Sequence, residues 1–345
     1  MTIVAAPLAI LLVVLLLPFW VKKIEDSLEL FLFAMGAIAV TLGARWSWPL
    51  AREALVEPIK ITAAVLVAGL LFKLLRPRVR KVMGAASSAL GARLIAFLVV
   101  VVLGFLSSAV TAIVAALLLV EAIDCMRLDR AAETKIVVLS CFAIGMGAAL
   151  TPLGEPLATI VVAKLRGEPY EASFWFLFSM LGRFVIPGIL GFGLLAAVLV
   201  GKGRKDDGLR EEREEGYLGI LLRAAKTYLF VVALVLLGAG FKPIVDAFVS
   251  KLPASGLFWL NSISAILDNA TLAAAEIGPS MGMDQIVYAL LGLLIAGGML
   301  VPGNIPNIIA AGRLKITSKE WMRIAAPVGA IAMALYFALL MAIGL

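Results

Sequence analysis

Two acidic residues lie inside apolar stretches of the chain, beside residues that interrupt helices or form turns. Glu155 occurs in TPLGEP, and Asp268 precedes Asn269 in ISAILDNAT. An ionised carboxylate is costly within a bilayer, so acids in such positions usually have a function. Burial raises the pKa of a carboxylate and a bound Na⁺ lowers it again, so one site can exchange the two ions. We therefore predict that Asp268 and Glu155 bind a transported Na⁺ or Li⁺, and take up a proton when the cation leaves.

Amide and hydroxyl side chains near the same stretches could supply further oxygen ligands, which hard cations prefer. Besides the two acids, the predicted ion and proton site contains Asn269, Asn304, Asn307, Ser107, Thr111, Thr151, Ser264 and Thr271. For Asn304 and Asn307, capping of the local backbone is an equally good interpretation.

Other charged residues have simpler interpretations. Arg183 is the predicted charge partner of Glu155 if that acid has a structural role. Glu121 and Asp124 are expected to be solvated near the end of a helical hairpin. The chain contains no histidine, so proton transfer would depend on carboxylates or lysines. Neither a catalytic Ser/Lys or Ser/His pair nor a histidine metal site is indicated, so we expect no enzyme activity and no cofactor.

The composition excludes a water-soluble protein with one packed core. Of 345 residues, 63% are hydrophobic and only 15% are charged, whereas soluble domains have about 25% charged residues. The apolar content suffices for roughly eight to ten bilayer crossings. The net charge is +7, because Lys and Arg outnumber Asp and Glu. The Lys and Arg residues are spread over short loops between apolar runs. That distribution orients a membrane protein, so we expect a lipid bilayer as partner and no nucleic acid.

Two kinds of interrupted segment are predicted. Segments 134–165 and 284–312 are apolar but contain Pro-rich stretches, so each should be a broken transmembrane helix. Segment 94–123 is flanked by basic residues on both sides, and basic flanks favour the cytoplasm. A single crossing would place one of the two flanks on the other side of the membrane. We therefore predict a re-entrant hairpin at 94–123, and a second one at 255–280. The loop charges then place the N-terminus outside, in a multi-pass protein of the plasma (inner) membrane.

The two halves of the chain resemble each other. Lys60 precedes Pro77 by the same interval as Lys226 precedes Pro243, and Pro152-x-x-x-Pro156 matches Pro302-x-x-x-Pro306. An odd number of crossings separates equivalent elements, which predicts two inverted repeats in an all-α polytopic membrane protein. The predicted organisation is as follows: two N-terminal transmembrane helices at 1–54, a first repeat at 55–200, a charged cytoplasmic linker at 201–216 and a second repeat at 217–345.

At these residues the chain resembles the ion transporter superfamily, and within it predicted cation transporters and NhaD-type Na⁺/H⁺ antiporters. ISAILDNAT is similar to the hairpin pattern of antiporters and arsenite permeases, and TPLGEP is similar to the broken-helix stretch of NhaD-type proteins. The resemblance implies a homodimer, an elevator-like motion, and an ion-site role for Asp268, Asn269, Thr151 and Glu155. The first hairpin departs from the pattern, because Thr111-Ala112 stands where a symmetric site would carry Asp-Asn. The Ser-Asn-Thr signature of dicarboxylate carriers is absent from both halves.

We therefore predict a secondary active transporter that exchanges Na⁺ or Li⁺ for protons by alternating access. The alternative is a Na⁺-coupled symporter of a small carboxylate or oxyanion. It would use the N-termini of the half-helices that follow the two breaks, because helix N-termini favour anions.

Overall fold

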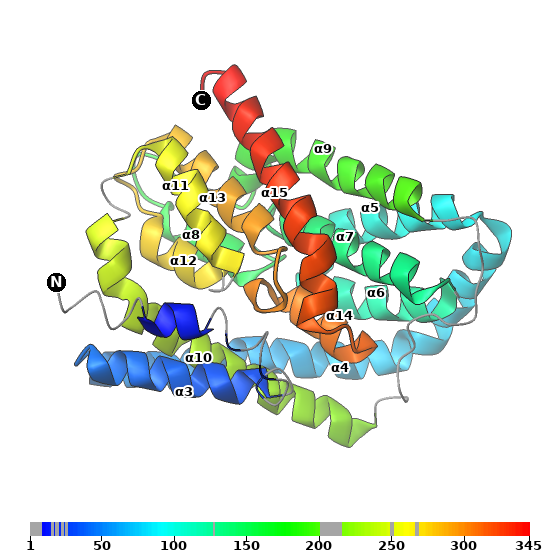
Figure 1. Cartoon of the computed structure of the whole chain (residues 1–345), viewed down its shortest axis with the longest axis horizontal. Coiled ribbons are helices and arrows are strands. Elements are labelled where there is room, and N and C mark those ends of the chain that lie inside the picture. Colours follow the sequence, from blue (N-terminus) through cyan, green and yellow to red (C-terminus); the bar gives the residue numbers. More distant parts are fainter. Residues whose placement is uncertain are drawn as a thin grey trace.

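The protein is helical throughout the part of the chain that the computed structural model describes (Figure 1). The described residues are 9–14, 17, 21, 24, 27–126, 128–200, 216–248, 252–265 and 269–345. Most of the predicted linker 201–216 therefore lies outside them, as does Asp268.

The α-helices have the following bounds: α3 Leu28–Leu42, α4 Trp48–Ala89, α5 Ala92–Val110, α6 Ala112–Met126, α7 Arg130–Ala148, α8 Pro156–Lys164, α9 Phe176–Leu199, α10 Tyr217–Phe248, α11 Ala254–Leu260, α12 Asn269–Glu276, α13 Met283–Ala296, α14 Ile305–Leu314 and α15 Ser318–Ala342. Two short 3₁₀ segments, η2 at Asn261–Ala265 and η3 at Val301–Gly303, follow α11 and precede α14 respectively.

Five of the described helices are long and apolar enough to cross a bilayer: α5, α7, α9, α15 and residues Tyr217–Phe241 of α10. These are the helices of a multi-pass membrane protein, as the composition predicted. Helix α7 is surrounded by other helices, because 89% of its apolar window is buried. Its neighbours are α5, α6, α9, α13, α14 and α15.

Helices α3, α4 and α10 pack together along one side of the molecule, at the bottom of Figure 1. An ion pair of 2.7 Å between Lys226 Nζ and Glu29 Oε1 joins α10 to α3. Helix α4 has 42 residues, about 63 Å at the usual rise. It continues through the basic stretch after residue 72, where the sequence predicted a loop, and it crosses the predicted domain boundary at 54/55.

Interruptions lie in all four segments where the sequence predicted a hairpin or a broken helix. In the first half, α5 and α6 meet at Thr111, and residues 149–155 separate α7 from α8. In the second half, α11 and η2 precede α12, and residues 297–304 separate α13 from α14. Pro156 and Pro306 lie in the first turns of α8 and α14, where the missing N–H costs nothing.

The same order of elements occurs twice, and the packing partners repeat with it. Helix α5 packs against α7, and α11 packs against α13; α4 packs against α6, and α10 packs against α12. The two halves then exchange partners: α6 of the first half packs against α14 of the second, and α8 packs against α12. These crosswise pairs bring both sets of interruptions together.

Candidate functional site

Helices α8 and α12 run parallel, so their N-terminal ends lie at the same end of the pair. The helices pack against each other. At their C-terminal ends, Lys164 Nζ of α8 donates a hydrogen bond of 3.2 Å to the carbonyl of Ile277, the residue after α12. Their N-terminal ends carry Glu155, the N-cap of α8, and Asn269, the first residue of α12.

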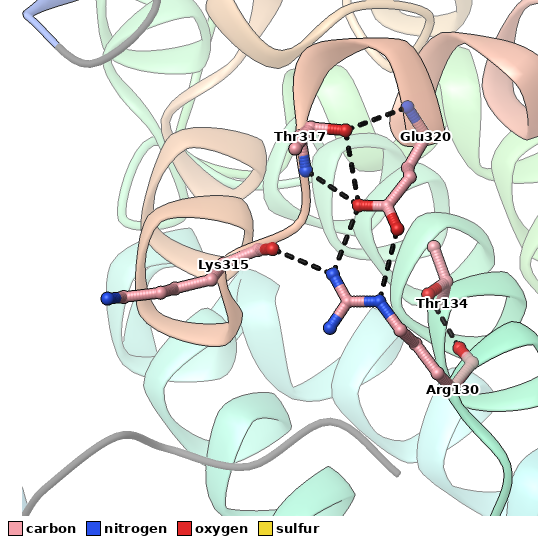
Figure 2. Close-up of polar contacts among 5 residues, drawn as sticks. All are labelled: Arg130, Thr134, Lys315, Thr317 and Glu320. Atoms are coloured by element: carbon pink, nitrogen blue, oxygen red, sulfur yellow. Dashed lines mark hydrogen bonds and ion pairs between the residues drawn. The ribbon is translucent and has the colours of Figure 1, made fainter. Parts of the chain in front are cut away.

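Helices α6 and α14 form a second parallel pair. Ile113 in the first turn of α6 belongs to one apolar cluster with Ile309 of α14. At the other end, Arg130, which begins α7 directly after α6, donates to the carbonyl of Lys315 at 2.9 Å. Figure 2 shows that the same guanidinium also holds both carboxylate oxygens of Glu320 at the start of α15, each at 3.1 Å. The C-terminal end of α14 is thereby fixed beside the end of α6.

The N-terminal ends of the two pairs converge, and we call this region the central junction: Thr111–Ala112, Thr151–Pro156, Asn269 and Asn304–Asn307. The backbone N–H of Ala112, at the start of α6, donates 2.8 Å to the carbonyl of Gly154, just before α8. The side-chain amide of Asn304 packs closely on Gly145 of α7. A Cβ added to Gly145 would lie only 2.5 Å from Asn304 Nδ2.

The junction also links α12 to α14. Gly297 follows α13, and a Cβ added to it would lie 3.7 Å from Asn269 Nδ2. The carbonyl of the same Gly297 accepts a hydrogen bond of 2.8 Å from Asn307 Nδ2. Four of the described helices therefore begin at the junction, and their N-termini carry partial positive charge.

Glu155 and Thr151, both predicted site residues, lie buried in the first break. Glu155 is 6% exposed and Thr151 is 5% exposed. The Thr151 hydroxyl donates to the carbonyl of Ser108, in the last turn of α5. The first break is thus tied to the end of α5 as well as to the start of α6, and it carries a carboxylate into the interior.

Asn307 is fully buried and its orientation is fixed by hydrogen bonds. Its Nδ2 donates to the carbonyls of Gly297 at 2.8 Å and Leu300 at 2.9 Å. Its Oδ1 is a buried acceptor with no hydrogen-bond partner among the described residues. Asn307 therefore holds the backbone of the second break, as one of the two interpretations predicted. Its role as an oxygen ligand stays a prediction.

Asn269 and Asn304 are buried as well, at 2% and 3% exposed. Asn269 Nδ2 has no partner among the described residues. Buried polar groups are rarely left unsatisfied. The donor of Asn269 and the acceptor of Asn307 are thus both free to bind a further polar group as far as the described residues go.

The hydroxyls of the first hairpin have local structural partners. Ser107 Oγ lies within hydrogen-bond distance of the carbonyls of Gly104, at 2.7 Å, and Ile144, at 2.9 Å, and joins α5 to α7. Thr111 has φ 88°, a conformation that β-branched residues rarely adopt, and its Oγ1 accepts a long bond of 3.4 Å from Val114 N. Thr111 remains at the junction, whereas the hydroxyl of Ser107 is occupied by the helix crossing.

Three predicted residues are not placed by the structure. Asp268 lies outside the described residues, between η2 and Asn269. Ser264 belongs to η2 and Thr271 to α12, but their side chains also lie outside the description. Their assignment to the ion site stays a prediction.

The structure does not bring Arg183 to Glu155, so the predicted charge pair is wrong. Arg183 is exposed on α9, whereas Glu155 is buried. The Arg183 guanidinium lies 4.7 Å from the ring centroid of Phe184. Helix α9 packs its other, buried face, which is mostly large and apolar, against α5 and α7, and this orientation leaves Arg183 on the outer surface.

Some buried polar residues were missed by the sequence reasoning. Glu121 is fully buried on α6, contrary to the expected solvation, because α6 packs against α4, α5, α7 and α14. Asn261, the first residue of η2, is 1% exposed, and its Nδ2 donates a hydrogen bond of 3.0 Å to the carbonyl of Ala289. Its position one turn before Ser264, within an apolar stretch, is the feature of the sequence that could have indicated its burial. Ser140 in the middle of α7 is also fully buried.

A resident metal centre is not indicated. Within the described part of the chain, no group of three or more Cys, Asp or Glu side chains is placed to hold a metal ion. The donors at the junction are amide, hydroxyl and single carboxylate oxygens, which suit a weakly held, exchangeable ion.

Comparison with known families identifies the family of the chain. The family model described as "Protein of unknown function (DUF1646)" matches residues 4–343, so the chain belongs to this family. No curated protein matches the chain.

Proposed function

We propose that this member of the DUF1646 family is a secondary active transporter that exchanges Na⁺ or Li⁺ for protons at the central junction. The observation that carries the proposal is the Oδ1 of the fully buried Asn307, which has no hydrogen-bond partner among the residues that the structure describes. An acceptor in this position calls for a cation or a proton donor, since its own amide nitrogen is already used by two carbonyls.

The buried acid of the first break completes the argument. Glu155 and Asn307 belong to elements that begin at the same junction, and Asp268 directly precedes Asn269 there in the sequence. A carboxylate in a low-dielectric interior is stable only when a cation or a proton compensates its charge. Alternation of the two at one place is the simplest basis for exchange.

The repeated order of elements and the crosswise pairs support an alternating-access mechanism. In transporters of this kind, interrupted helices from two inverted repeats meet near the bilayer midplane around the ion. We propose that 94–123 and 255–280 are re-entrant hairpins of such repeats. The resemblance to the ion transporter superfamily adds an elevator-like motion and a homodimer to the proposal, in a plasma membrane with the N-terminus outside.

A second function is favoured by one specific observation. Four helix N-termini converge at the junction, and Asn269 Nδ2 is a buried donor without a partner among the described residues. Both features favour an anion. A Na⁺-coupled symporter of a small carboxylate or oxyanion would place Na⁺ at the acid and the anion at the N-termini.

The two functions are separated by transport measured in liposomes that contain the purified full chain and an internal pH dye. Exchange predicts a pH change when Na⁺ or Li⁺ is added alone, and its loss in Glu155→Gln and in Asp268→Asn. Glu171→Gln, which removes an exposed acid from the loop after α8, is the matched control and should transport normally. A response that requires an added carboxylate or oxyanion would contradict exchange and support symport.

A further inference from the structure

Arg183 interrupts an otherwise apolar, outward-facing stripe of the membrane helix α9. It is the only charged residue between Phe176 and Leu199. Along the same exposed stripe lie Leu190, Leu194 and Val198, and the last two are 60% and 73% exposed. These apolar neighbours are suited to lipid acyl chains, so a cation among them needs a specific partner.

Within the described part of the chain, that partner is absent. No carboxylate, carbonyl or hydroxyl group there forms an ion pair or hydrogen bond with the Arg183 guanidinium. Its described contact is the cation–π contact with Phe184, whose ring centroid is 4.7 Å away. Phe184 is itself buried, so the ring covers one side of the guanidinium from within the protein. The N–H donors of the guanidinium therefore have no oxygen partner among the residues that the structure describes.

The level of the bilayer surface is indicated by exposed aromatic residues at the start of α9. Phe174, Trp175 and Phe178 are 39%, 60% and 43% exposed. Their rings form edge contacts, with Trp175 4.9 Å from Phe174 and 5.9 Å from Phe178. Clusters of exposed Trp and other aromatic side chains mark the headgroup region of a membrane protein. We call these three residues the aromatic cluster.

Arg183 lies within reach of that level. Eight residues separate it from Trp175, about 12 Å along a helix. The Cα–Cβ bonds of a helix are tilted towards its N-terminus, so an extended arginine side chain at this position can reach towards the end of α9 that carries the aromatic cluster. Long basic side chains extend in this way to the interface.

We propose that Arg183 binds the phosphate of an anionic phospholipid at the headgroup level that the aromatic cluster marks. Guanidinium pairs with phosphate through two parallel hydrogen bonds and tolerates a ring on one face. The apolar stripe below Arg183 would receive the acyl chains of the same lipid. The site lies on the outer surface of α9 and does not depend on the transport function of the junction.

Trp175 supplies a built-in probe of this site. The full chain is placed in phosphatidylcholine bilayers with brominated phosphatidylglycerol or brominated phosphatidylcholine, and bromine quenching of tryptophan is measured. Subtraction of the signal of Trp175→Phe isolates the quenching at the aromatic cluster. We expect the native chain to prefer phosphatidylglycerol by about fivefold, the effect of one basic residue near an anionic lipid.

Two variants decide the outcome. Arg183→Gln should remove the preference, and Arg183→Lys should keep part of it. Arg93→Gln, which removes an exposed arginine from the start of α5, should leave the preference unchanged. Equal quenching by both lipids in the native chain would overturn the proposal, as would an equal loss in Arg183→Gln and Arg93→Gln. So would a native oligomer that Arg183→Gln dissociates without changing the lipid preference, because a second copy would then be the partner.

Discussion

The two halves of the molecule have the same order of elements but distribute their polar groups differently. In the first half the acid, Glu155, lies in the break before α8, and the hairpin carries Thr111. In the second half the break before α14 carries the amides Asn304 and Asn307, and the acid Asp268 precedes α12. Each half thus has one acid among the predicted site residues. In the first half it lies in the break, whereas in the second half it lies in the predicted hairpin.

This difference matters because the half-helices pair crosswise. The acid-bearing break before α8 faces α12 of the second half, where Asn269 is the first residue. The amide-bearing break before α14 faces α6 of the first half, whose start is uncharged. One pair therefore carries charge and the other carries neutral oxygen and nitrogen, so the junction is asymmetric although the order of elements is the same in both halves.

The largest effect expected from this comparison is on transport. Glu155→Gln keeps the shape of the side chain but removes its charge, and it should lower Na⁺-dependent proton flux at least about tenfold, or about 1.4 kcal/mol of transition-state stabilisation. The equivalent position of the second half is Ile305, and Ile305→Val should change the flux little. Flux in liposomes, normalised to the amount of folded protein, provides the measurement. Equal losses in both variants would show that the charge difference between the breaks has no role.

A second prediction concerns two helix crossings, of α5 with α7 and of α11 with α13. A Cβ at Gly147 of α7 would overlap the carbonyl oxygen of Gly104 of α5, whereas a Cβ at Gly292 of α13 would lie 2.6 Å from the Phe258 carbonyl oxygen. Gly147→Ala should cost about 3 kcal/mol of stability, the upper range for overpacking. Gly292→Ala should cost less, since its contact is longer.

Thermal unfolding in detergent measures this series. Gly191→Ala is the control, because no atom lies within 4 Å of its Cβ position. It should be neutral or stabilising, since alanine favours helix more than glycine does. A cost for Gly292→Ala that equals or exceeds that of Gly147→Ala would contradict the described packing.

The third prediction tests whether the second break depends on its amide. Asn307→Leu removes the donor to the carbonyls of Gly297 and Leu300. The Leu300 carbonyl keeps the backbone N–H of Gly303 at 3.3 Å, whereas the carbonyl of the buried Gly297 loses its described side-chain donor. The expected cost is about 2 kcal/mol in unfolding free energy. Asn307→Asp keeps an oxygen but loses the donor, so it should also be destabilised. Unchanged stability of Asn307→Leu would show that these hydrogen bonds do not hold the break.

The smallest effect is expected at the contact that fixes the end of α14 (Figure 2). Arg130→Ala removes the two bonds to Glu320 and the bond to the Lys315 carbonyl. Because the side chains of Arg130 and Glu320 are 44% and 41% exposed, solvent screens the pair. The cost should be about 1 kcal/mol or less. A melting temperature of Arg130→Ala below that of the native chain at low salt, with a smaller difference at high salt, would support this. A cost of several kcal/mol in unfolding free energy would contradict it.

The interruptions could be predicted from sequence because their causes are local. Pro152 and Pro302 cannot continue a helix, and proline is accepted again in the first turn of the next one, at Pro156 and Pro306. The burial of Asn307 and Glu155 also followed, since both lie within apolar segments. These features depend on residues only a few positions apart.

Other features depend on long-range packing and could not be predicted. The crosswise pairing of α6 with α14 and of α8 with α12 joins distant segments. The outward direction of Arg183 is set by which side of α9 packs on α5 and α7, and an almost wholly apolar helix gives no periodicity from which to infer that side. Helix α4 continues through its basic residues, because charged side chains interrupt an apolar run without interrupting a helix.

The central claim, that Na⁺ and protons compete for the buried acid of the junction, is tested most directly by proton release from the purified protein. Na⁺ is added to the detergent-solubilised full chain in a weakly buffered solution, and the pH is recorded against an equal addition of choline. The account predicts that Na⁺ releases protons from the native chain and that Glu155→Gln releases markedly fewer. No release on addition of Na⁺, or the same release from Glu155→Gln, would contradict it.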